Sequence, residues 1–321
     1  MGFDVKDIAG LSEPAKKLIE VVSSGIGGVF RPRSMRNEAD AKAYEIRAIA
    51  SAEADANVTK ANGQIRAELE RIITLAGADT AIVDRAKMRL LSREIEGQMN
   101  VEAIAEQALL GLPESVSGQP VSDDWKRKFF LGAENICDVD LQLLWGKVLA
   151  GEVVSPGTYS LRTLEILKHL TKEEAEFFRI ACSLAFRDGW IIKPAGDINT
   201  ALKPYGLDYD ALLTLRDAGL MHEGDNLIKD FSNAANMPSI IFINNGVYMH
   251  LSGAAVGQQK LPSIPFTRAG QELQNLLEDN PCTPFLQSVV GYFRARGLTV
   301  KKGKQISNEA GVNALTFEED F

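Results

Sequence analysis

Histidine and cysteine are both scarce in this sequence of 321 residues, and neither stands where metal or thiol chemistry would need it. No two cysteines form a CxxC pair, and no histidine has a partner at a metal-ligand spacing such as HExxH. An odd number of separated cysteines suits a reducing compartment, in which thiols pack as small apolar side chains. We therefore expect no metal and no other cofactor. The residues concerned are His169, His222, His250, Cys137, Cys182 and Cys282.

Positive charge is not in surplus, and long apolar runs are absent. The chain has 35 lysines and arginines against 43 aspartates and glutamates, which gives a net charge of −8. The chain as a whole therefore does not attract nucleic acid, although a local basic patch is still allowed. No run of 18 apolar residues occurs, so a spanning helix is not expected, and Asp4 and Asp7 stand where a secretory signal is positive. We expect a cytoplasmic protein, with peripheral attachment at the inner membrane as the alternative.

Assembled catalytic motifs are also missing. The glycine-rich stretch SSGIGG at residues 23–28 lacks the preceding strand and the Lys-Ser or Lys-Thr pair that a phosphate-binding loop needs. No GxSxG nucleophile motif occurs. Adjacent carboxylates such as Glu173 and Glu174 are typical of solvated helix faces. Because no residue can be named as catalytic, the sequence favours a protein that binds or assembles, and an unrecognised enzyme stays an alternative.

Residues 1–36 form an amphipathic N-terminal segment. At residues 11–30, apolar side chains recur at helical spacing with Lys16, Lys17 and Glu20 between them, and three arginines follow. Such a segment can insert its apolar face among lipid chains while the arginines meet anionic head groups. The same face can instead pack on the protein or on a second subunit, and we favour assembly. The residues of this membrane or assembly face are Leu18, Ile19, Val22, Ile26, Phe30, Arg31, Arg33 and Arg36.

Residues 37–112 contain no proline and predict a long helical hairpin, an oligomerisation arm. Residues 38–76 are rich in strong helix formers, and Gly77 marks a break before a second helix at about residues 80–110. The apolar stripe of the first helix is thin, so this helix should pair with a neighbour. We therefore expect self-association through residues 11–112, and hence a homo-oligomer. The apolar positions of the second helix are Ile82, Met88, Leu91, Ile95, Met99, Ile104 and Leu109.

The rest of the chain divides into three predicted segments. Residues 113–188 should form a compact helical domain, residues 189–306 a winged-helix-like α+β domain, and residues 307–321 a mobile tail. The predicted fold class is mainly α, and α+β overall. It consists of a long N-terminal helical arm, a central helical block and a C-terminal winged-helix-like unit.

Two local signals support this division. Thr171, followed by Glu174 three positions later, predicts a capping box at the start of a helix. Asn245 and Gly246 separate two β-rich runs and predict a two-residue hairpin turn. A helix, this hairpin and another helix follow one another in the order of a winged-helix unit.

Six basic residues in the C-terminal half are candidates for contact with nucleic acid. In a winged helix, the helix at residues 208–218 would read the base edges, and it offers one basic donor among three aspartates. A second basic group at residues 294–304 follows Tyr292 and Phe293, and basic and aromatic side chains together can hold a nucleic-acid backbone. The alternative is an edge strand that lysines protect against aggregation. The candidates are Arg216, Arg294, Arg296, Lys301, Lys302 and Lys304.

Residues 139–178 carry a resemblance to known families. The elements that match are LWGKVLAGE, SPGTYSLRTLEILKHL and the helix start KEEAEFF. They resemble a bacterial family of unknown function, whose beginning is also similar to SEPAKKLIEVVSSGIGGVFRPRSMR, over most of residues 10–280. The pattern is more distantly similar, over about 40 residues, to the abortive-infection alpha family, whose members are linked to defence against phage. The resemblance implies a shared architecture and a role in bacterial defence or the response to cell stress.

The expected function is therefore that of a non-enzymatic interaction and assembly protein in anti-phage defence. The alternatives are a winged-helix regulator that binds DNA and an effector that attaches to a membrane through residues 11–30. Besides a second copy of the chain, the candidate partners are a phage or host protein, a membrane surface and a nucleic acid.

Overall fold

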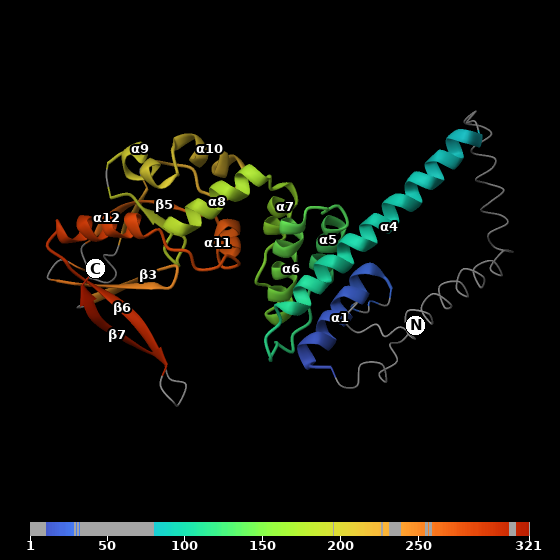
Figure 1. Cartoon of the computed structure of the whole chain (residues 1–321), viewed down its shortest axis with the longest axis horizontal. Coiled ribbons are helices and arrows are strands. Elements are labelled where there is room, and N and C mark those ends of the chain that lie inside the picture. Colours follow the sequence, from blue (N-terminus) through green and yellow to red (C-terminus); the bar gives the residue numbers. More distant parts are fainter. Residues whose placement is uncertain are drawn as a thin grey trace. The chain divides into compact units, whose positions relative to one another are not determined.

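A computed structural model of the chain describes most of residues 80–320 and a short N-terminal helix. The described residues form two compact units, Met1–Thr158 and Tyr159–Phe321, and each is considered by itself. They contain ten α-helices and two antiparallel sheets, so the predicted mainly α, α+β class is confirmed (Figure 1). The described ranges are 11–28, 30, 32, 80–194, 196–225, 227–230, 239–253, 256, 259–307 and 313–320.

The first unit is helical. It contains α1 (Glu13–Ile26), α4 (Thr80–Leu110), α5 (Asp123–Ala133) and α6 (Val139–Val154). Its core is built around the fully buried Trp145, whose ring centroid lies 5.0 Å from that of Phe129. The second half of α4 packs closely on α6, because Gly146 leaves no side chain there: a Cβ at this position would lie 2.6 Å from the Cβ of Gln107.

The helices of the second unit are α7 (Leu161–His169), α8 (Lys172–Leu184), α9 (Ile198–Ala201), the 3₁₀ turn η3 (Lys203–Tyr205), α10 (Tyr209–Asp217), α11 (Arg268–Gln274) and α12 (Thr283–Arg294). Most of them begin at a side-chain cap, and α12 and η3 are the exceptions among those described. The capping box predicted at α8 is confirmed: Glu174 N donates to Thr171 Oγ1 and Thr171 N donates to a carboxylate oxygen of Glu174. At α7 the cap is one-sided: the backbone N of Thr163 donates to Ser160 Oγ.

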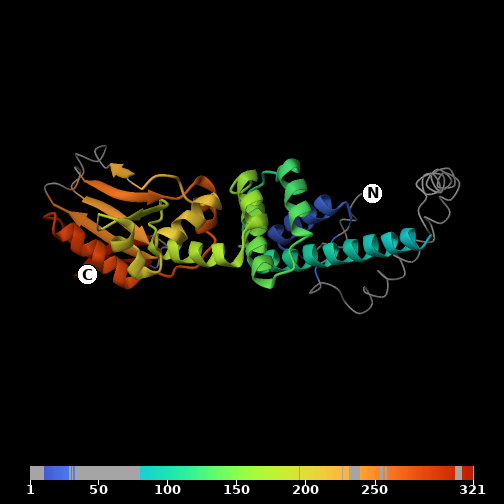
Figure 2. The same ribbon diagram turned by 90° about the horizontal axis from the view of Figure 1, so that it is seen from above.

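Two antiparallel sheets complete the second unit. The first has the order β1-β5-β2, formed by β1 (Trp190–Ile192), β5 (Lys260–Pro265) and β2 (Ile228–Asp230). The second has the order β3-β4-β6-β7, formed by β3 (Ser239–Asn244), β4 (Val247–Ser252), β6 (Thr299–Ser307) and β7 (Asn313–Asp320). Helix α12 packs against this second sheet, where the ring centroids of Phe242 and Phe293 are 5.7 Å apart (Figure 2).

The predicted hairpin is confirmed, and its surroundings differ from a free two-stranded wing. Asn245 and Gly246 turn between β3 and β4 with φ of 43° and 75°, the positive values that a type I′ turn requires. The hairpin is extended by β6, which pairs with β4 on one side and with β7 on the other. Strand β6 is therefore internal to the sheet. This corrects the expectation that its lysines protect an edge strand. Strand β7 lies in residues 307–321, the segment expected to be a mobile tail.

Candidate functional site

The apolar face of α1, expected to meet lipid or another subunit, is covered within the first unit. Leu18 and Val22 are fully buried, and Ile19 and Phe30 nearly so, because α1 packs on α5 and α6. Ile26 is half-buried. The other three residues of the expected face, Arg31, Arg33 and Arg36, lie outside the described residues. Among the helices that the structure describes, none has the length and hydropathy needed to cross a bilayer.

Polar contacts hold α1 in this position. Lys17 Nζ donates to the carbonyl oxygen of Ser117 at 2.6 Å, and burial lowers the pKa of this lysine although Glu20 and Glu152 raise it.

Gly25 lies directly against the ring of Phe130: a Cβ there would come within 2.0 Å of two ring carbons. The glycines of SSGIGG therefore include one that allows close helix packing, which explains part of this motif without a phosphate.

Helix α4 carries large apolar side chains on its surface. Every residue from Asp84 to Glu96 is exposed. Four apolar residues share one side of the helix, because they are spaced by three or four positions. We call them the α4 stripe: Met88, Leu91, Ile95 and Met99, with exposed fractions of 67%, 56%, 52% and 55%.

The α4 stripe does not continue the face by which α4 is anchored. In the second half of the helix the buried residues are Val101, Ile104, Ala105 and Ala108. At about 100° per residue, the mean direction of these four is roughly 135° around the helix from that of the stripe. Figures 1 and 2 show that the first half of α4 extends beyond α1, α5 and α6. The stripe is therefore presented outward by a helix whose other end is fixed in the core of the unit.

Arg216, the predicted base-edge donor of α10, is buried. Its side chain is 4% exposed, and it pairs with Asp225 Oδ1 at 2.7 Å. Lys193 is also buried and donates to the carbonyl oxygen of Asp225, and its pKa is lowered chiefly by burial. The two cations thus tie β1 and α10 to the loop before β2. The expectation that Arg216 reads bases is corrected, because a side chain engaged in this way cannot enter a DNA groove.

The remaining basic candidates do not converge on one face of the structure. Arg294 and Arg296 are exposed at the end of α12, where the Arg296 guanidinium lies 4.2 Å from the Tyr292 ring centroid. Lys301 is paired with His250 and Lys302 with Met249, so these neighbours on β6 point to opposite faces of the sheet. The backbone of Lys304 pairs with Thr316.

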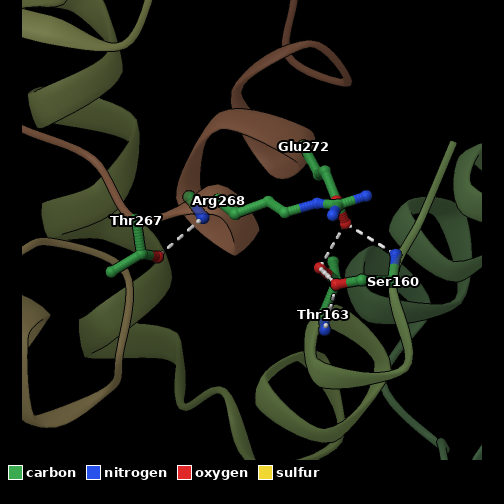
Figure 3. A network of polar contacts seen from close by, with 6 residues as sticks. Ser160, Thr163, Thr267, Arg268 and Glu272 are labelled. Carbon is green, nitrogen blue, oxygen red and sulfur yellow. Dashed lines mark hydrogen bonds and ion pairs between the residues drawn. The ribbon is translucent and has the colours of Figure 1, made fainter.

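A polar junction between α7 and α11 was not found from the sequence (Figure 3). Glu272 Oε2 accepts from the backbone N of Ser160 at 2.7 Å and from Thr163 Oγ1 at 2.5 Å, while Oε1 accepts from Arg268 Nε at 2.8 Å. The Glu272 side chain is 10% exposed. Both carboxylate oxygens are occupied by protein donors, so this cluster joins two helices and offers no free base for catalysis. The sequence signal was weak, because over 100 residues separate the partners.

The His, Cys, Asp and Glu side chains of the described residues do not form a reactive centre. In the part of the chain that the structure describes, no three His, Cys, Asp or Glu side chains are grouped as a metal site. His169 and His222 are exposed, and His250 stacks on Phe317 with ring centroids 4.7 Å apart. Burial raises the pKa of the Cys182 thiol well above its ordinary value, which disfavours the reactive thiolate.

Comparison with known proteins finds a family model that matches part of the chain. Residues 84–194 match the model of a family described as a protein of unknown function (DUF2806). The match begins within α4 and includes residues 139–178, so the resemblance to a family of unknown function is confirmed over this part of the chain. No curated protein and no solved structure matches the chain.

Proposed function

We propose that the protein acts by assembly rather than by catalysis, with the α4 stripe as its binding surface. The observation that carries this proposal is the exposure of four apolar side chains on one side of a helix that is anchored by a different side. Single exposed apolar residues are ordinary on protein surfaces, but a contiguous row of them marks an interaction site. A row at helical spacing fits a partner that is itself a helix.

The biological setting that we propose is abortive infection, in which the assembly acts with a phage or host protein. This setting rests on the distant resemblance that the pattern of residues 139–178 has to the abortive-infection alpha family, and the family model that matches these residues is of unknown function. The two alternatives have less support. DNA binding loses its base-reading candidate because Arg216 is buried, and membrane attachment through α1 loses its apolar face because Leu18, Ile19 and Val22 are buried.

Phage challenge of cells that carry the gene tests this function. Leu91→Asp with Ile95→Asp places two charges in the stripe, and we expect the cells to lose protection, measured as plating efficiency and host survival. The matched control is Ala86→Asp with Leu90→Asp, which adds the same charges at exposed positions on another side of α4. Leu90 is 60% exposed, much like Leu91, so exposure does not distinguish the two pairs. Equal protection by wild type and the stripe variant, or no protection by wild type, would refute the proposal.

A further inference from the structure

Charge is divided unequally along α4. Residues 80–93 contain four basic residues and one acidic residue, a net charge of +3, whereas residues 94–110 contain four glutamates and no basic residue, a net charge of −4. This order is the reverse of what an isolated helix favours, because the helix dipole attracts acidic residues to the N-terminal end and basic residues to the C-terminal end. The charged residues are Asp84, Arg85, Lys87, Arg89, Arg93, Glu94, Glu96, Glu102 and Glu106.

The α4 stripe has its centre where the charge changes sign. Met88 and Met99 are equally far from the boundary between Arg93 and Glu94, and Leu91 and Ile95 are equally far from Arg93. The apolar row and the charge pattern therefore share one midpoint. A helix with these properties is complementary to a copy of itself that runs in the opposite direction.

We infer that two copies of the chain pair through α4 in antiparallel orientation, centred near Arg93. This inference rests on the proposed function, because it names the partner of the same surface. In such a pair, Met88 of one copy faces Met99 of the other, and Leu91 faces Ile95. The basic half of each helix faces the acidic half of the other, with Arg89 near Glu96, and the two helix dipoles are opposed.

Other arrangements of two copies are disfavoured by the same charges. A parallel pair in register would place basic halves side by side and acidic halves side by side, and like charges at this distance repel. The stripe is bounded by Asp84 and Glu102, and each has a partner in its own helix: Lys87 Nζ is 3.6 Å from Asp84, and Gln98 Nε2 donates to Glu102 at 3.0 Å. The apolar contact then covers the twelve residues from Met88 to Met99, about 17 Å of helix. This is small for a stable interface, so we expect a reversible, concentration-dependent dimer.

Disulfide formation between full-length chains tests the orientation. Met88→Cys and Met99→Cys are made singly in chains in which Cys137 and Cys282 are serine, while Cys182 is buried and stays. In the antiparallel pair the two copies of position 88 lie about 16 Å apart along the axis, too far for a disulfide. We expect a mixture of the two variants to give the mixed disulfide and Met88→Cys alone to give almost none. Efficient disulfide formation by Met88→Cys alone would show a parallel pair and overturn the inference.

Sedimentation of the wild-type chain over a range of concentrations tests the pairing itself. We expect dimers that dissociate on dilution, and a loss of at least tenfold in affinity when Arg85→Glu is combined with Arg89→Glu. Circular dichroism verifies that the variant is folded, which is expected because both side chains are exposed. A chain that is monomeric at every concentration overturns the inference and leaves the stripe to another partner or another segment.

The two proposals can fail separately. If the chain is monomeric but the stripe variant still loses phage protection, pairing is wrong while the binding function stands. If the chain pairs as inferred but the stripe variant protects normally, the pairing stands and the proposed function is wrong.

Discussion

Single residues in this protein are constrained mainly by close packing between helices. Gly25 accommodates the Phe130 ring and Gly146 accommodates the backbone of α4. In the sequence Gly25 belongs to a glycine-rich stretch and Gly146 carries no signal of its own, because only their spacing along the chain is visible. Their role depends on atoms of another helix, so it becomes clear only when the helices are packed.

Replacing Gly25 with alanine should destabilise the protein although alanine favours helix. The added methyl would meet the Phe130 ring, and overpacking of a core costs about 1–3 kcal/mol, which exceeds the roughly 1 kcal/mol gained in helix propensity. The free energy of unfolding in urea is the measurement. Gly28→Ala is the control, because nothing lies within 4 Å of its Cβ position. Equal stability of the two variants would contradict this account of Gly25.

At the scale of elements, signals within a few residues were reliable and those across long separations were not. The capping box of Thr171 and Glu174 and the turn at Asn245-Gly246 join residues that are close in sequence, so their chemistry is visible there. Strand β6 is internal because it pairs with β4 on one side and with β7, the next strand along the chain, on the other. Its internal position was missed because residues 307–321, which contain β7, were expected to be a mobile tail. The contact between Glu272 and Thr163 spans 109 residues and has no sequence signature.

Replacing Glu272 with alanine should loosen the junction of α7 and α11. The Ser160 N–H and the Thr163 hydroxyl would lose a charged acceptor, and each such hydrogen bond contributes about 1.5–3 kcal/mol. Because the Thr163 hydroxyl keeps its contact with Ser160 Oγ at 2.9 Å, we expect less than the sum of two such bonds, a loss of roughly 2–4 kcal/mol in the free energy of unfolding, measured by chemical denaturation. The control is Glu278→Ala, since Glu278 is exposed. A change no larger than that of the control would show that the junction does not stabilise the fold.

At the scale of the whole molecule, the sequence predicted the fold class better than it predicted which apolar faces are exposed. The helical composition and the β-rich C-terminal half gave the α+β class correctly. Two amphipathic helices were recognised, but periodicity does not tell which apolar face the protein itself covers. The structure covers the face of α1 and exposes the α4 stripe. The sequence therefore identified both apolar faces, and only the packing of the helices shows which of them is covered. Of the hairpin predicted for residues 37–112, residues 37–79 lie outside the described residues.

The division into two units leads to a prediction about fragments of the chain. Each unit has its own buried core, around Trp145 in the first and around Phe266 and Phe293 in the second. A cut between Thr158 and Tyr159 leaves all strand pairings within one fragment. We therefore expect residues 1–158 and 159–321 to fold separately, each with a cooperative thermal transition by circular dichroism. Because the α4 stripe belongs to the first fragment, sedimentation should find concentration-dependent dimers of residues 1–158 and monomers of residues 159–321. Dimers confined to the second fragment would place assembly outside the stripe.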